Sequence, residues 1–230
     1  DQDIRAEKAK ALRSLRKYTP SEAAANFVRG QYAAGDNNNE YRKEDGVDPK
    51  SITETYVAAK LTFDSYRWAG VPFYVRTGKL LAGKFTRVDV VFKKPLIDIF
   101  ATPANSNDQK LNNNVLTIYI DPTPGFSLTL NAKKVGQGYT TEPIDLTFNQ
   151  SAEQKALSPE PYERLFHDAL EGNSTNFASW SEIADAWQFV DVIRQVWDHE
   201  EPNFPNYQPG SMGPKEADEL LARDGRQWVY

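Results

Sequence analysis

The stretch Thr86-Arg87-Val88-Asp89-Val90-Val91-Phe92-Lys93 decides the fold class of this chain. Thr, Val, Val and Phe stand at its even positions, and Arg, Asp, Val and Lys stand at its odd positions. Successive side chains of a strand point to opposite faces of a sheet, so this period of two predicts a strand with two unlike faces. The odd positions form a mixed face, in which Val91 lies among three charged residues, and we expect this outer face to be partly buried.

Six further β-prone runs surround this strand and are expected to pair with it. They lie at 27–32, 54–63, 71–77, 115–120, 126–132 and 144–148. Most connections between them are too short for the crossover that parallel neighbours need, which favours antiparallel pairing.

Helical periodicity flanks the strands on both sides. It predicts helices at 4–18, at 159–171 behind the N-cap Ser158, at 181–197 and at 216–223. Thr19 and Pro20 are expected to end the first helix, and the polar segment 35–49 is expected to be a loop. The sequence therefore predicts the α+β class, with one large, mostly antiparallel β-sheet and helices packed on one face.

The composition excludes several classes of protein and site. Among 230 residues there is no Cys, which excludes a disulfide framework, a thiolate zinc site and a cysteine nucleophile. The net charge of −5 disfavours nucleic acid as a partner, although it permits a local basic cluster. No apolar run approaches the roughly 18 residues of a membrane span, so we expect no membrane partner.

A basic cluster surrounds Gly78 in this acidic chain. Lys79 and Lys84 stand five positions apart after a predicted strand, and both ammonium groups could converge on one anion, such as a phosphate. The alternative is two solvated surface lysines, which composition alone favours. Asp121 ends another predicted strand, where its carboxylate could accept hydrogen bonds from sugar hydroxyls or could simply mark a turn before Pro122.

The other candidates for chemistry have weaker patterns. His167 and His199 have no Ser, metal-ligand or second-His arrangement around them, so we expect packing or surface roles. Trp180, Trp187 and Trp197 are expected in the core, with an aromatic carbohydrate platform as the alternative. No G-x-G-x-x-G or G-x-x-x-x-G-K-[ST] string is present, so no cradle for a nucleotide cofactor is visible.

Four strings give the chain a family resemblance. They are RWAGVPF at 67–73, VRTGK at 75–79, PYERL at 161–165, and GSMGP at 210–214 with EAD at 216–218. In order and spacing they resemble the C-terminal domain of the glucose-6-phosphate dehydrogenase family, most closely enzymes of lactic acid bacteria. The resemblance covers essentially residues 1–230.

The resemblance implies a cytoplasmic enzyme of the pentose phosphate pathway that oxidises glucose 6-phosphate to 6-phosphogluconolactone with NADP. It further implies that the NADP-binding Rossmann domain and the general-base His lie outside these residues, so that the chain alone is inactive. The remaining domain, residues 1–230, binds substrate and forms a homodimer through its β-sheet. The alternative is a free-standing dimerisation or carbohydrate-binding module.

The resemblance assigns roles to three residues. Lys79 and Lys84 match basic positions that contact the sugar phosphate, and Asp121 matches a strand-end position near the sugar. His167 and His199 match no catalytic position. We therefore expect substrate-binding residues here, but no catalytic, metal-binding or cofactor-binding residue.

Overall fold

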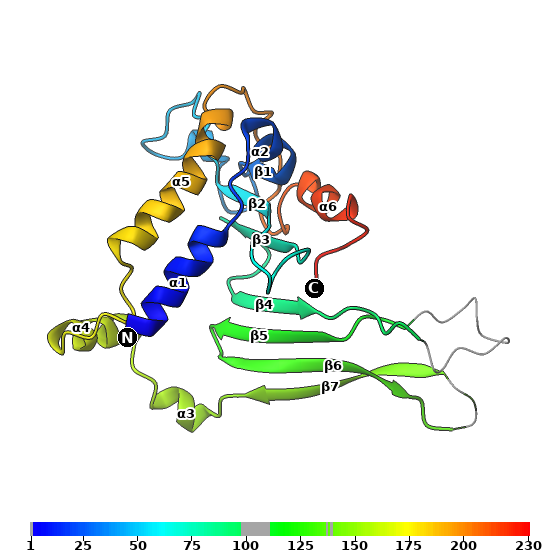
Figure 1. The fold of residues 1–230 in the computed structure, drawn as a ribbon. Helices are drawn as coiled ribbons and strands as arrows, with labels where there is room; N and C mark the ends of the chain where they lie inside the picture. The colour runs from blue at the N-terminus through cyan, green and yellow to red at the C-terminus, as the bar shows by residue number, and fades with distance from the viewer. Residues whose placement is uncertain (1, 98–110, 137, 139) are drawn as a thin grey trace. The chain divides into compact units, whose positions relative to one another are not determined.

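A computed structural model describes residues 2–97, 111–136, 138 and 140–230 (Figure 1). The chain divides into two compact units, which are described separately. The first combines Asp1–Gly83 with Pro161–Tyr230, and the second is Lys84–Glu160.

The first unit is built on a three-stranded antiparallel sheet. Its order is β1 (Phe27–Gly30), β2 (Tyr56–Leu61) and β3 (Phe73–Gly78). In the central strand β2, apolar or small residues occupy consecutive positions from Tyr56 to Ala59 instead of alternating with polar ones. Such a strand is suited to burial on both faces.

Helices accordingly cover both faces of this sheet, rather than one face as expected. Tyr56 and Ala58 pack with α6 (Lys215–Ala222), while Ala59 packs with α2 (Pro20–Asn26) and α5 (Trp180–Trp197). The first helix, α1 (Gln2–Ser14), contacts α5. This unit therefore holds two buried clusters, one on each side of β2.

Several helices differ from the predicted ranges, and local capping explains two of these differences, at α2 and α3. Thr19 and Pro20, expected to end a helix, instead begin α2: the Thr19 side chain accepts from the Glu22 N–H, and the Glu22 carboxylate accepts from the Thr19 N–H. Ser151 and Gln154 form the same capping box at α3 (Ala152–Ala156), which was not predicted. The following helix, α4, spans Pro161–Leu170 and starts later than the predicted 159. A short 3₁₀ helix, η1 (Tyr41–Lys43), lies in the predicted loop.

The second unit is an antiparallel meander with α3. Its strands are β4 (Thr86–Val91), β5 (Val115–Asp121), β6 (Gly125–Lys133) and β7 (Thr141–Asn149), and each pairs with the next (Figure 1). The α+β class and the antiparallel pairing are confirmed, but the described strands form two sheets instead of one.

The two faces of this second sheet differ sharply. One face carries continuous apolar rows: Val88, Ile118, Phe126 and Phe148 are successive partners across the four strands, as are Val90, Leu116, Leu128 and Leu146. We call these eight residues the apolar face. Six of them (Val88, Val90, Ile118, Phe126, Leu146 and Phe148) are between 39% and 53% exposed.

The opposite face of the sheet is polar. Arg87 Nε lies 3.0 Å from Asp89 Oδ2, and the Thr117 hydroxyl donates to Asp89 Oδ1 over 2.8 Å. Arg87 and Asp89 are partly buried, as expected for this face, whereas Val91 is exposed. The large exposed apolar surface therefore lies on the even positions of β4, not on the mixed odd positions.

None of the helices in the described residues is long and apolar enough to cross a membrane.

Candidate functional site

The loop that follows β3 starts from a tightly packed glycine. Gly78 pairs with Tyr56 of β2, and a Cβ built at Gly78 would lie 2.6 Å from Tyr56 Cδ2. Tyr56 is only 1% exposed, so its ring has little space into which it could move. Glycine at 78 thus lets an aromatic ring lie directly against the strand end that carries Lys79.

Hydrogen bonds fix the main chain of this loop. The Lys79 N–H donates to the Thr55 carbonyl over 2.8 Å, and the Tyr207 hydroxyl donates to the Lys79 carbonyl over 2.9 Å. Leu80 follows in the left-handed region, with a φ of 51°. Two further hydrogen bonds connect the loop to residues 210–211. The Gly210 N–H donates to the Leu80 carbonyl, and the Ala82 N–H donates to the Ser211 carbonyl.

The Lys79 side chain, in contrast, is exposed. In the part of the chain that the structure describes, no carboxylate forms an ion pair with Lys79 or with Lys84. A fixed backbone below an unpaired ammonium group presents a positive charge from a defined position, which suits an anionic ligand.

The other two predicted residues belong to the second unit. Lys84 is its first residue and is exposed, and Asp121 ends β5 opposite Thr86 of β4. The expected convergence of Lys79 and Lys84 on one anion stays a prediction.

Asp121 borders a concavity of about 340 Å³ within the second unit. Its other lining residues are Phe85, Arg87, Tyr119, Pro122, Thr123, Thr147 and Asn149. This surface combines a carboxylate acceptor with hydroxyl, amide and guanidinium groups and aromatic rings, a mixture suited to a hydroxylated ligand. Sequence reasoning did not identify Thr147 and Asn149, which the β6–β7 register places opposite Ser127 and Gly125.

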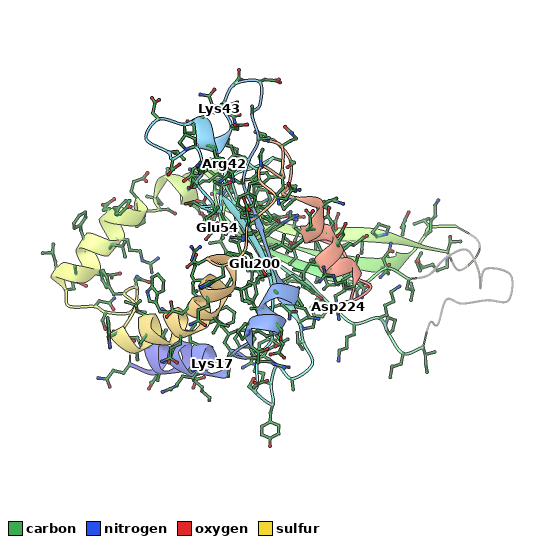
Figure 2. All side chains as sticks on the ribbon, turned by 90° about the horizontal axis from the view of Figure 1, so that it is seen from above. Lys17, Arg42, Lys43, Glu54, Glu200 and Asp224 are labelled. Atoms are coloured by element: carbon green, nitrogen blue, oxygen red, sulfur yellow. The ribbon has the colours of Figure 1, made fainter. Side chains whose placement is uncertain are left out.

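A second set of contacts supports β3, the strand that leads to Lys79. Asp224, labelled in Figure 2, follows α6; its Oδ2 lies 2.6 Å from Lys60 Nζ of β2, and it accepts from the Tyr74 hydroxyl of β3. These hydrogen bonds, from Lys60 first, lower the pKa of Asp224 below its ordinary value. Burial, with the bond to Asp224 second, raises the pKa of Tyr74. Asp224 therefore stays charged and Tyr74 stays neutral, and their contacts with Lys60 and with each other connect β2 and β3 to the end of α6.

Arg76, on the strand that ends at Gly78, contacts two C-terminal aromatic rings with its guanidinium group. Its carbon is 4.3 Å from the Trp228 ring centroid and 5.1 Å from that of Tyr230. Both distances are within the range of cation–π attraction. These rings pack against the very strand from which the Lys79 loop emerges.

The remaining sequence candidates lie apart from any chemical site. His167 and His199 are exposed; among the described residues, His167 Nε2 lies near Glu171 and His199 Nδ1 near the Gln195 carbonyl. Trp197 is buried as predicted, but the prediction of a core position is wrong for Trp180 and Trp187, which are exposed. Among the described residues, no group of three or more His, Asp and Glu side chains could hold a metal ion.

Comparison with known proteins shows one consistent similarity. Residues 1–229 match the model of the family described as "Glucose-6-phosphate dehydrogenase, C-terminal domain". The chain is 46% identical to glucose-6-phosphate 1-dehydrogenase of Bacillus subtilis (strain 168), a match covering 99% of the chain and 46% of that relative. The corresponding enzyme of Leuconostoc mesenteroides is 44% identical, with 100% and 46% covered.

Solved structures agree with these matches. The X-ray structure of glucose-6-phosphate 1-dehydrogenase from Mycobacterium avium has a TM-score of 0.77 at 31% identity, covering 99% of this chain and 44% of that one. A glucose-6-phosphate dehydrogenase in complex with its substrate glucose-6-phosphate has a TM-score of 0.83 at 26% identity, covering 100% and 46%. The chain spans about half the length of the relatives that it matches, and it belongs to the glucose-6-phosphate dehydrogenase C-terminal domain family.

Proposed function

We propose that this chain is the substrate-holding part of a cytoplasmic, NADP-dependent glucose-6-phosphate dehydrogenase. The observation that carries the proposal is the exposed Lys79 ammonium, which forms no ion pair within the described ranges, on a loop whose main chain is fixed by Thr55 and Tyr207. Lys79 contacts the anionic sugar phosphate and orients it. Lys84 adds a second positive contact, and the Asp121 carboxylate accepts hydrogen bonds from the sugar.

The described residues do not fit the cofactor itself. No strand in the described ranges leads through a Gly-rich turn into a helix: β3 ends at Gly78 without a following helix, and β7 reaches α3 through Gln150 and Ser151. The proposal therefore assigns these residues to binding and orienting the sugar phosphate and assigns no step of hydride transfer to them.

Replacing Lys79 in the complete enzyme tests the proposal. Loss of one charge-assisted contact of about 1.5–3 kcal/mol lowers kcat/KM for glucose 6-phosphate by about 10- to 150-fold. Lys79→Arg restores only part of this loss, because a planar guanidinium does not replace a compact ammonium. The matched control is Lys43→Ala, an exposed lysine of η1 labelled in Figure 2. Unchanged kinetics for Lys79→Ala would overturn the proposal.

We also propose that the apolar face of the second unit forms the homodimer interface. Its two rows span all four strands and carry no charge. Such a surface is self-complementary, so two copies can bury it against each other about a two-fold axis. On the opposite face, Arg87, Asp89 and Thr117 already form an ion pair and a hydrogen bond within the sheet.

Neighbouring positions of β7 offer a matched test of the interface. Leu146 lies in the second apolar row, whereas Thr147 lines the polar face. Sedimentation of the complete protein at micromolar concentration should show a dimer, which Leu146→Glu dissociates and Thr147→Glu leaves intact. A monomer without any substitution, or a dimer that survives Leu146→Glu, would refute this interface.

A further inference from the structure

The Tyr207 hydroxyl contacts both the loop that presents Lys79 and Thr55, the residue just before β2. It is 4% exposed. Its hydroxyl lies 2.9 Å from the Lys79 carbonyl, 2.9 Å from Thr55 Oγ1 and 3.2 Å from the Thr55 carbonyl. The main chain of Tyr207 is itself held, because its carbonyl accepts from the Ala33 N–H over 2.8 Å.

Donor and acceptor accounting gives these contacts a direction. Thr55 Oγ1 accepts from the Tyr32 N–H over 3.1 Å, so its own proton is available for Tyr207 Oη. The Tyr207 proton is then free for the Lys79 carbonyl, which has no proton to give. Burial raises the pKa of Tyr207, which keeps this donor protonated. The result is one chain of hydrogen bonds from Tyr32 through Thr55 and Tyr207 to Lys79.

We infer that Tyr207 is a positioning residue for substrate binding, acting through the main chain of Lys79. This inference depends on the proposed substrate contact of Lys79. The Thr55 carbonyl holds the Lys79 N–H and the Tyr207 hydroxyl holds its C=O, so the two peptide groups that flank the Lys79 Cα are both fixed. Without the hydroxyl, the carbonyl of Lys79 loses its partner and the peptide between Lys79 and Leu80 can rotate. The ammonium group then samples more positions, and ordering it on the sugar phosphate costs more.

The test is a double-mutant cycle in the complete enzyme, between Tyr207→Phe and Lys79→Ala. Loss of one hydrogen bond predicts that Tyr207→Phe raises KM for glucose 6-phosphate by about three- to tenfold. KM for NADP should stay unchanged. In the Lys79→Ala background, the same Tyr207→Phe change should have no further effect on KM, because the ammonium group that it positions is gone.

Tyr18→Phe is the matched control. Tyr18 is also buried, and its hydroxyl donates to the carbonyl of another lysine, Lys60, over 2.9 Å. It lies in the cluster with α2 and α5, on the other side of the sheet from Tyr207. Both Tyr→Phe variants should lower the unfolding temperature similarly, but only Tyr207→Phe should raise KM for the sugar phosphate.

The outcomes separate this inference from the proposed function. A normal KM for Tyr207→Phe beside a raised KM for Lys79→Ala overturns the positioning role alone. An equal effect of Tyr207→Phe in both backgrounds, or an equal effect of Tyr18→Phe, also overturns it, since the cause is then general destabilisation. Unchanged kinetics for Lys79→Ala overturns the substrate role of Lys79 and the positioning role with it.

Discussion

Gly78→Ala should destabilise the protein and disturb the Lys79 loop together. The added Cβ would lie 2.6 Å from Tyr56 Cδ2 and 3.3 Å from the Thr55 carbonyl oxygen. The first distance is far below ordinary van der Waals contact, which begins near 3.5 Å between carbon atoms. Tyr56 cannot easily withdraw, because Gly213 also approaches the same ring so closely that a Cβ there would overlap it.

Two opposing effects set the size of the change. Replacing Gly by Ala reduces the entropy of the unfolded chain, which stabilises by about 0.4–1 kcal/mol where the folded state accepts a side chain. Overpacking a buried site costs about 1–3 kcal/mol and sometimes more. Because the Tyr56 ring is buried and lies close to both Gly78 and Gly213, we expect overpacking to prevail, with a net loss of about 1–2 kcal/mol. For a chain of this size that corresponds to a fall in Tm of about 2–8 °C.

Thermal unfolding followed by circular dichroism measures the shift in Tm. Steady-state kinetics of the complete enzyme measures how far the disturbed Lys79 loop lowers kcat/KM for glucose 6-phosphate. Gly70→Ala is an informative control: Gly70 has a φ of +75°, and nothing lies within 4 Å of its added Cβ. It therefore reports backbone strain without overpacking. If Gly78→Ala unfolds at or above the temperature of the unchanged protein, Tyr56 yields freely and the steric argument fails.

Three further predictions concern the packing and charges around this loop. Trp228→Ala should lose at least the roughly 0.5–2 kcal/mol of cation–π contact with Arg76, measured as a lower unfolding temperature. Trp228→Phe should lose less stability, and equal unfolding temperatures for the two variants would contradict the contact. Burial raises the pKa of Tyr56. The stabilisation from its neutral side chain is therefore full below the unfolded tyrosine pKa near 10 and is lost as pH rises above that value. In denaturant unfolding, Tyr56→Phe should flatten this alkaline loss of stability, and an equal loss in both proteins would contradict the prediction. Lys60 lowers the pKa of Asp224, so this stabilisation is present above the ordinary carboxyl pKa and is lost as pH falls through the lower folded value. Asp224→Asn should weaken the acid dependence of denaturant unfolding, and an unchanged acid dependence would contradict the role of this ion pair.

The strands were largely predictable because their signal is local. Period two fixed β4 to within two residues of its observed end, and β5 and β6 lie within one residue of the predicted bounds. The division into two sheets was not predictable in this way, since alternation shows that a strand has two faces but not which strand lies beside it. The double burial of β2 is visible afterwards in the run Tyr56 to Ala59, where the alternation breaks down.

The helices that were missed share one cause. Thr19 was expected to end the preceding helix, and no helix was expected after Ser151. Each of these residues instead forms a capping box with a residue three positions later, at the start of α2 and of α3. Pro20 was read as a helix breaker, although proline is well suited to the first helical position. The predictive signal was present in the sequence, in Glu22 and Gln154.

For the candidate site, too, a local motif could predict some residues and only the fold could reveal the others. The VRTGK string identified Lys79, but Tyr207 lies 128 positions away and no spacing rule connects the two. Likewise, Thr147 and Asn149 enter the concavity beside Asp121 only through strand register. Residues that touch a ligand can carry a local motif, while residues that position them are brought together by the fold.

The packing around Tyr56 and Tyr207 fixes the backbone below the exposed Lys79. A lysine side chain loses up to about 2 kcal/mol of rotamer freedom when it is ordered on a ligand. The protein cannot remove this side-chain cost without burying the ammonium group, but it can remove the additional cost of ordering the backbone below it. Under the proposed substrate role of Lys79, Gly78, Tyr56 and Tyr207 would do so before substrate arrives, since they fix both the strand end and the carbonyl of Lys79. Stability and substrate affinity should therefore change together for substitutions beneath this loop, and separately for substitutions on the apolar face of the second unit.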